Sequence, residues 1–154
     1  MTFTIKNKIK RPVNILINDG CKEEISHIIF LDTLPETEEA ESIKDYLERN
    51  IDLFVPSLMY QTETTTVFRA LKVSSICYIK DLYPIEKIIE IKKEISFVFS
   101  NGTKLNVAID KESDKDQNRV IDYLNRPERF IELVSSRSSI FINKDLVSDV
   151  TEIE

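Results

Sequence analysis

The two glycines of this chain lie in matching settings, and this match constrains the fold more than any other feature of the sequence. Gly20 and Gly102 each follow a short apolar run that ends in Asp or Asn, and each precedes a second apolar run. An Asp-Gly or Asn-Gly pair between two apolar runs is a strong signal for a β-hairpin. The sequence therefore predicts one such hairpin in each half of the chain.

Three further matches follow in the same order. They are Asp45-Tyr46-Leu47 with Asp122-Tyr123-Leu124, Phe54 with Phe130, and Val73-Ser74 with Val147-Ser148. The separation between matching residues falls from 82 at the glycines to 77, 76 and 74. A second copy with shorter loops would produce such a stepwise fall. We therefore predict a tandem duplication.

Each copy is expected to be a small, mainly β (α+β) unit. After the hairpin and a polar connector comes a short helix, whose apolar face is Ala40, Ile43, Tyr46 and Leu47 in the first copy and Val120, Tyr123 and Leu124 in the second. The acids Glu36, Glu38 and Glu39 are expected at the start of the first helix. Three strand candidates follow the helix in each copy: 53–59, 64–71 and 73–79, then 130–134, 139–142 and 146–153. Five strands and one inserted helix predict a small bent sheet or an SH3-like barrel.

The duplication also predicts where the chain divides. We expect a first β-rich repeat over residues 1–80, a connector over 81–94 and a second β-rich repeat over 95–154. The segment 84–94 has apolar residues at both helical and strand spacing, and we favour a strand there.

Composition weighs against several classes of function. The chain has 27 acidic and 21 basic residues, and its net charge of -6 argues against nucleic-acid binding. Two glycines are too few for a phosphate-binding glycine loop. No apolar run approaches the roughly 18 residues that span a bilayer, and no export signal follows the basic N-terminus. We expect a cytoplasmic protein with no membrane contact, and we expect Cys21 and Cys77 to be reduced and partly buried.

Few residues suggest chemistry. His27 lies between isoleucines in a strand candidate, so a partly buried, hydrogen-bonded ring fits better than a metal ligand or a base. The acidic run 36–41 lacks the glycine turn of a calcium loop and fits a solvated helix start. We therefore expect no enzyme, no catalytic residue, no cofactor and no metal.

A candidate partner surface comes from charged residues spaced three or four apart. These are Asp45, Arg49, Arg119, Asp122 and Arg126. Such spacing places them on one face of each helix, where they form surface ion pairs or contact a partner. Asn143-Lys144, between two strand candidates, fits a turn.

The second copy also resembles an uncharacterised bacterial domain family with the pattern Arg-x-x-Asp-aromatic-Leu-Asn, then Phe, Leu and an Asn-Lys pair. The matching residues are Arg119, Asp122, Tyr123, Leu124, Asn125, Phe130, Leu133, Ile142, Asn143, Lys144 and Val147. The resemblance covers residues 95–153, with a weaker version over 13–79. In the first copy Glu48 replaces the Asn and no Asn-Lys pair precedes Val73. The resemblance implies architecture and no known reaction.

These observations together predict a non-enzymatic protein-binding or scaffolding module that uses its sheet edges or its helix face. The alternatives are a β-barrel that senses a small ligand or a nucleotide, and then an Sm-like RNA-binding barrel. The sequence leaves the partner and the oligomeric state open.

Overall fold

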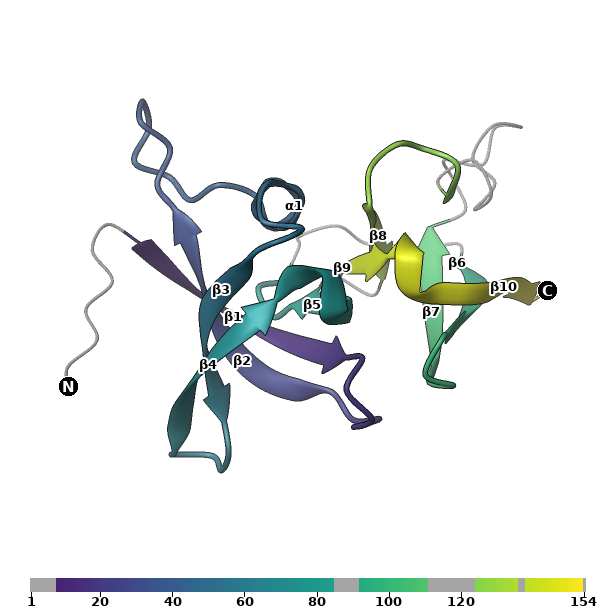
Figure 1. Cartoon of the computed structure of the whole chain (residues 1–154). Coiled ribbons are helices and arrows are strands. Elements are labelled where there is room, and N and C mark those ends of the chain that lie inside the picture. The colour runs from purple at the N-terminus through teal and green to yellow at the C-terminus, as the bar shows by residue number, and fades with distance from the viewer. Residues whose placement is uncertain (1–7, 85–91, 111–123, 136–137, 154) are drawn as a thin grey trace.

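The computed structural model describes residues 8–84, 92–110, 124–135 and 138–153. The first half contains β1 (Lys8–Ile17), β2 (Ile25–Asp32), α1 (Ile43–Arg49), β3 (Phe54–Tyr60), β4 (Thr66–Lys72), the 3-10 helix η1 (Val73–Ser75) and β5 (Ile76–Asp81). The second half contains β6 (Lys92–Phe99), β7 (Lys104–Asp110), β8 (Phe130–Ser135), β9 (Ser138–Asn143), the 3-10 helix η2 (Lys144–Leu146) and β10 (Val147–Ile153). The mainly β prediction is confirmed (Figure 1).

The strands form two sheets rather than closed barrels. One sheet has seven strands in the order β4-β3-β2-β1-β5-β9-β8, and the other has three in the order β10-β6-β7. The larger sheet crosses from one half to the other because β5 pairs antiparallel with β9. The sheets are not closed into a barrel, and of the two predicted forms, a bent sheet or an SH3-like barrel, neither is confirmed in detail. The backbone of β5 pairs with a strand of the other half, so each half shares a sheet with its neighbour.

Both hairpin turns use their glycine in the same way. Gly20 has φ 90° and Gly102 has φ 87°, a backbone conformation that other residues adopt only with strain. The preceding side chain fixes each turn, because Asp19 Oδ1 and Asn101 Oδ1 each accept a hydrogen bond at 3.0 Å from the backbone N–H two residues on.

Helix α1 begins later than the acidic run predicts. Ser42 is its N-cap, and the Ser42 hydroxyl accepts a hydrogen bond at 3.1 Å from the Asp45 N–H. The acids at 36, 38 and 39 lie in the preceding loop, where Glu38 has φ 58°, so the prediction that they begin the helix is wrong. Most of the second predicted helix, including Val120 and Tyr123, lies outside the described residues. The segment 84–94 is described only at its ends, and Lys92–Glu94 belong to β6.

The same backbone hydrogen bonds hold both 3-10 helices. Asn18 N–H donates to Ser75 O, and Ser100 N–H donates to Leu146 O, both at 2.8 Å. Val73 N–H donates to Leu53 O at 3.1 Å, and Lys144 N–H donates to Arg129 O at 2.9 Å. Val73 therefore corresponds to Lys144, at a separation of 71, and the sequence match of Val73 with Val147 is wrong because these residues lie in different elements.

The core consists of two clusters, one associated with each half. The first cluster lies under α1 and contains Tyr46, Leu47, Ile76 and Ile79. It also contains Phe130 and Phe141, which the second half contributes. The second cluster lies between the two sheets and is built around Phe97 and Phe99. The predicted boundary between residues 80 and 95 thus runs through a shared core, and the duplication stays a prediction.

Candidate interaction surface and groove

The β3–β4 hairpin carries large apolar side chains that face solvent. Leu53 is 54% exposed, Phe54 is 67% exposed and Phe68 is 53% exposed. Ala70, on the same strand face as Phe68, is exposed as well. We call Leu53, Phe54, Phe68 and Ala70 the β4 surface. Clustered exposed apolar side chains mark interaction sites more often than isolated ones do.

Strand register extends the β4 surface across the sheet. Pro12 pairs with Ile28, Ile28 pairs with Leu58, and Leu58 pairs with Phe68. These four residues form one cross-strand row on one face of β1 to β4, and Pro12, Ile28 and Leu58 are half-buried. β4 is the end strand of the seven-stranded sheet, so the row stops at a sheet edge.

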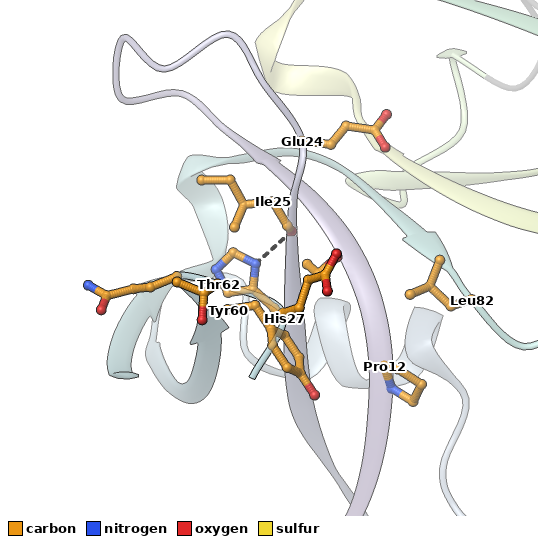
Figure 2. Close-up of a pocket in the computed structure, with 10 residues that line it drawn as sticks. Pro12, Glu24, Ile25, His27, Tyr60, Thr62 and Leu82 are labelled. Carbon is orange, nitrogen blue, oxygen red and sulfur yellow. Dashed lines mark hydrogen bonds between the residues drawn. The ribbon is translucent and has the colours of Figure 1, made fainter. Parts of the chain in front are cut away.

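A groove of about 620 Å³ lies beside this row, between β2, the β3–β4 turn and the end of β5 (Figure 2). Its lining includes Pro12, Glu24, Ile25, His27, Tyr60, Thr62 and Leu82. Leu82 is half exposed, so the groove continues the apolar character of the row.

His27 is fully buried and its Nδ1 lies 2.9 Å from the Ile25 carbonyl oxygen. Because a carbonyl only accepts, Nδ1 carries the proton of the neutral ring. Burial lowers the pKa of His27, and the Arg69 charge lowers it further, although the bond to Ile25 opposes this. The ring is therefore neutral at pH 7. The predicted buried, hydrogen-bonded histidine is confirmed.

Glu24 at the groove rim is already bonded to its neighbours. Its carboxylate accepts from Tyr78 Oη at 2.5 Å and lies 2.7 Å from Lys80 Nζ. Burial alone would raise the pKa of Glu24, but the hydrogen bonds from Lys80 and Tyr78 outweigh it and the pKa is lowered. Burial and Glu24 together raise the pKa of Tyr78. These groups stabilise one another in fixed positions.

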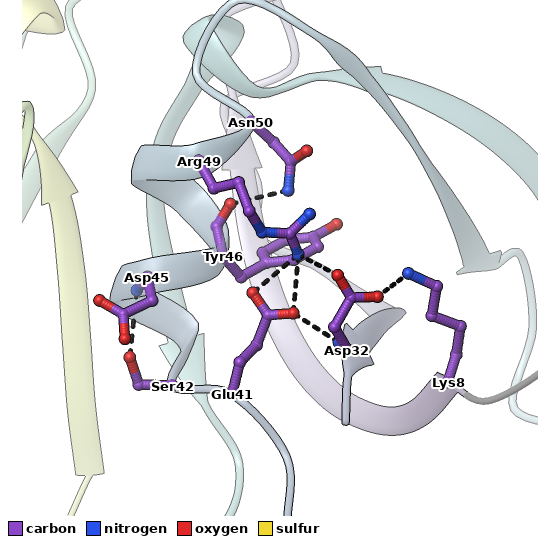
Figure 3. Close-up of polar contacts among 8 residues, drawn as sticks. All are labelled: Lys8, Asp32, Glu41, Ser42, Asp45, Tyr46, Arg49 and Asn50. Atoms are coloured by element: carbon purple, nitrogen blue, oxygen red, sulfur yellow. Dashed lines mark hydrogen bonds and ion pairs between the residues drawn. The ribbon is translucent and has the colours of Figure 1, made fainter. Parts of the chain in front are cut away.

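An ion-pair cluster holds the end of α1 against β2 (Figure 3). The Glu41 carboxylate is buried and accepts from Arg49 Nη2 at 2.8 and 2.7 Å and from the Asp32 N–H at 2.5 Å. Arg49 also lies 2.8 Å from Asp32, which pairs in turn with Lys8. Breaking such a connected cluster costs more than losing one exposed ion pair.

The residues of the predicted partner surface have separate surroundings. Arg49 contacts Glu41 and Asp32 within the fold, and Asp45 is exposed in the first turn of α1. Arg126 is exposed, and its carbonyl accepts from Lys144 Nζ. Arg119 and Asp122 lie outside the described residues. The partner surface at these five positions stays a prediction.

Sequence reasoning missed the β4 surface. The sequence places residues 53, 54 and 68 in strand candidates, and alternation alone does not reveal which face of β4 the other described residues leave exposed. The Asn143-Lys144 turn is found as predicted. Asn143 caps η2 through a 3.1 Å bond from the Asp145 N–H, and Lys144 Nζ donates to Leu124 O at 3.1 Å.

The cysteines differ from one another. Both are free, and Cys77 is buried, which raises its pKa to about 11. Cys21 is exposed because it follows the Gly20 turn, so the prediction that it is partly buried is wrong. Among the described residues, His, Cys, Asp and Glu side chains form no group of three that could hold a metal ion. No helix in the described part of the chain is long and apolar enough to cross a membrane.

Comparison of the chain with protein-family models, with characterised proteins and with solved structures finds no match. The resemblance of the second half to a bacterial domain family therefore stays a prediction.

Proposed function

We propose that this protein is a non-enzymatic interaction module that binds another protein chain at the edge of β4. The observation that carries the proposal is the exposure of Phe54 beside an end strand. A phenylalanine at 67% exposure loses the free energy of apolar burial, which is about 1.5–3 kcal/mol for a fully buried side chain. A partner that covers the β4 surface recovers it.

The edge itself offers the second contribution to binding. β4 pairs with β3 along its whole length, from Phe54 with Lys72 to Tyr60 with Thr66. An extended segment that adds to the other side of β4 gains backbone hydrogen bonds, and alternate side chains of that segment contact Phe68 and Ala70. Lys72 is exposed at this edge, and Arg69 of the same strand pairs with Asp19 at 3.1 Å. The positive charge of Lys72 discourages pairing of the edge with itself and favours an acidic segment.

We further propose that residues 13–79 and 95–153 are two copies of one unit. The support is the shared detail of backbone structure: the paired glycine turns, the paired hydrogen bonds at η1 and η2, and a bulge in the same place. In the β1–β5 ladder the register shifts at Cys77, which is paired with no residue of β1. In the β6–β10 ladder the register shifts in the same way at Ser148, which is paired with no residue of β6. A bulge is specific enough that its recurrence favours common origin.

The small-ligand alternative has less support. The groove has the volume for a ligand, but Glu24 is bonded to Tyr78 and Lys80, and His27 in its lining is fully buried. Among the described residues, His27 Nε2 has no hydrogen-bond partner. A ligand there would meet few polar groups that are not already bonded to the protein.

Affinity purification of the full chain from its native cells, read by mass spectrometry, tests the proposal. Wild type is compared with Phe54→Ser and with the control Leu34→Ser, which changes an apolar residue of 43% exposure in another loop. We expect wild type and the control to recover the same partner and Phe54→Ser to lose it. Recovery of that partner by Phe54→Ser would contradict the proposal.

A further inference from the structure

We propose that the β4 surface binds a second copy of this chain, with β10 of one molecule paired antiparallel to β4 of the next. This inference rests on the proposed function and names the partner of the same surface. It follows from a junction that the molecule already contains once, between its own two halves.

That internal junction joins the last strand of the first half to the fourth strand of the second half. β5 pairs with β9 through Tyr78 with Ile142, Ile79 with Phe141 and Lys80 with Ile140. In the order of elements, β10 corresponds to β5 and β4 corresponds to β9. Both β10 and β4 are end strands of their sheets, and they lie on opposite sides of the molecule in Figure 1. The two edges that form the internal junction thus recur at the two ends.

Side chains at the internal junction show what the β4 surface lacks. Phe130 begins β8 and is fully buried in the core of the first half, and Phe141 is buried there too. The corresponding residues of the first half are Phe54, which begins β3, and Ala70. Phe54 is 67% exposed, so the other residues that the structure describes leave most of its side chain uncovered. A preceding copy would cover it as the first half covers Phe130.

At the other end of the molecule, apolar residues of the second core are only partly buried. In the first half Leu47, Ile76 and Ile79 are fully buried, under the cover of Phe130 and Phe141. Their counterparts in the second half are Leu124, Val147 and Val150, and these pack on the second core but are only partly buried. Within the described part of the chain, these three residues are therefore less covered than their counterparts in the first half.

Contacts of α1 show that the junction involves more than one ladder. Glu48 Oε1 accepts a hydrogen bond at 2.8 Å from the Phe130 N–H, and Asn143 Nδ2 donates to Ser74 O at 3.2 Å. In the proposed assembly the segment that begins at Leu124 occupies the place of α1 and lies beside Phe54 of the next copy.

Charge favours pairing between these two end strands. β4 carries Arg69 and Lys72 and no acid, whereas β10 carries Asp149 and Glu152 and no base. The register of the internal junction, moved by the separation of 71, pairs Asp149 with Leu71, Val150 with Ala70 and Thr151 with Arg69. Asp149 then lies diagonally across from Arg69, whose guanidinium already pairs with Asp19 at 3.1 Å and would be shared between the two carboxylates.

An interface of this kind is head-to-tail, because each molecule contributes β10 on one side and β4 on the other. Such contacts continue from copy to copy until they close into a ring or extend as a filament. A symmetric dimer is therefore not the expected product.

Sedimentation velocity and light scattering of the full chain over a wide concentration range test this. We expect the mass to rise with concentration above 17.9 kDa. Phe54→Ser removes the exposed ring of the β4 surface. The double variant Asp149→Lys with Glu152→Lys reverses the charge of β10 at two exposed positions. Each variant alone is expected to stay monomeric with an unchanged circular dichroism spectrum, while the control Leu34→Ser assembles like wild type.

Mixing the two disabled variants is the decisive measurement. One retains an intact β10 and the other an intact β4, so the mixture is expected to form a one-to-one dimer and nothing larger. A wild-type chain that stays monomeric, or a mixture that stays monomeric, would overturn the inference. Loss of a different captured protein from Phe54→Ser would then still support the proposed function. Assembly that survives Phe54→Ser would overturn the inference alone, whereas capture of the same partner by Phe54→Ser would contradict the proposed function.

Discussion

The two halves of the molecule have the same order of elements but bury residues at matching places to very different extents. The five strands of the first half share one sheet, whereas those of the second half are divided between two sheets. Phe130 is fully buried where Phe54 faces solvent, and Leu47 is fully buried where Leu124 is not. The local sequence does not explain this difference, because Phe54 and Phe130 both begin the third strand of their half. Phe130 and Phe141 of the second half pack in the core of the first half together with Leu47, whereas Leu124 is only partly buried and Phe54 is 67% exposed.

The comparison also shows which interactions belong to a unit and which belong to a junction. The glycine turns and the bonds at η1 and η2 recur in both halves, so they stabilise each unit by itself. The bond from the Phe130 N–H to Glu48 and the pairing of Lys44 with Glu128 at 3.7 Å join the halves. Variants at these two kinds of position should therefore behave differently.

The largest contrast is expected between Phe130→Ala and Phe54→Ala. Removing the buried ring should lower the free energy of unfolding by about 3–5 kcal/mol. Removing the exposed ring of Phe54 should change it by less than about 0.5 kcal/mol, as at other surface sites. Urea denaturation at low protein concentration measures both losses. Equal losses would contradict the expected difference in burial between Phe130 and Phe54.

A second contrast concerns Tyr46 of α1, whose ring is buried and whose hydroxyl has no hydrogen-bond partner among the described residues. Tyr46→Ala should cost about 3 kcal/mol or more through lost packing. Tyr46→Phe should be neutral or stabilising, because it removes a buried hydroxyl that lacks a partner. Thermal melting of both variants tests this, and a large loss in Tyr46→Phe would show that the hydroxyl is bonded after all. Tyr123→Ala, expected from the sequence to melt early as well, extends the comparison to the second half.

The sequence predicted the described strands of each half and the helix of the first half, because local signals determine them. Alternation defined the strands, and the residues before Gly20 and Gly102 defined the turns. The start of α1 was missed because the Ser42 cap is a single residue, whereas the acidic run before it is long. The connection of β5 to β9 and the exposure of Phe54 were missed for a different reason. Both depend on which sheet edges meet, and strand patterns do not contain that information.

A smaller effect should be shared by both halves. Gly20→Ala and Gly102→Ala each place a β-carbon on a backbone with φ near 90°, which costs about 1–2 kcal/mol in the left-handed region. No crowding adds to this, since Gly20 has open space and Gly102 meets only the flexible end of Lys22 at 3.7 Å. Similar losses in the two variants, measured by urea denaturation, would support equivalent turns. A loss at one glycine alone would show that the turns differ in their contribution.

The smallest expected effect is a pH dependence of folding stability that arises in the first half alone. His27 of β2 pairs with Val13 of β1, and Val107 of β7 pairs with Ile95 of β6. Val13 and Ile95 are 82 residues apart, like the two glycines, so the buried Val107 occupies the place of His27 in the second half. Only the first half therefore contains a buried group that titrates near neutral pH at this position. Burial and Arg69 lower the pKa of His27 below its ordinary value of 6.5, so below that pH the unfolded chain binds more protons than the folded chain. Stability should consequently fall as pH decreases from neutral, until His27 is protonated in the folded chain as well.

The variant His27→Val copies the residue of the second half and removes the titrating group. Its stability should be nearly independent of pH between about 7 and 5, since the next groups to respond are carboxylates with unfolded pKa values near 4. Glu24, whose pKa is lowered in the folded chain, contributes stability that is lost only in that more acidic range. Urea denaturation of wild type and His27→Val at several pH values separates the two windows. An unchanged slope in His27→Val would assign the neutral-range dependence to another group and would leave the two halves alike in their response to pH.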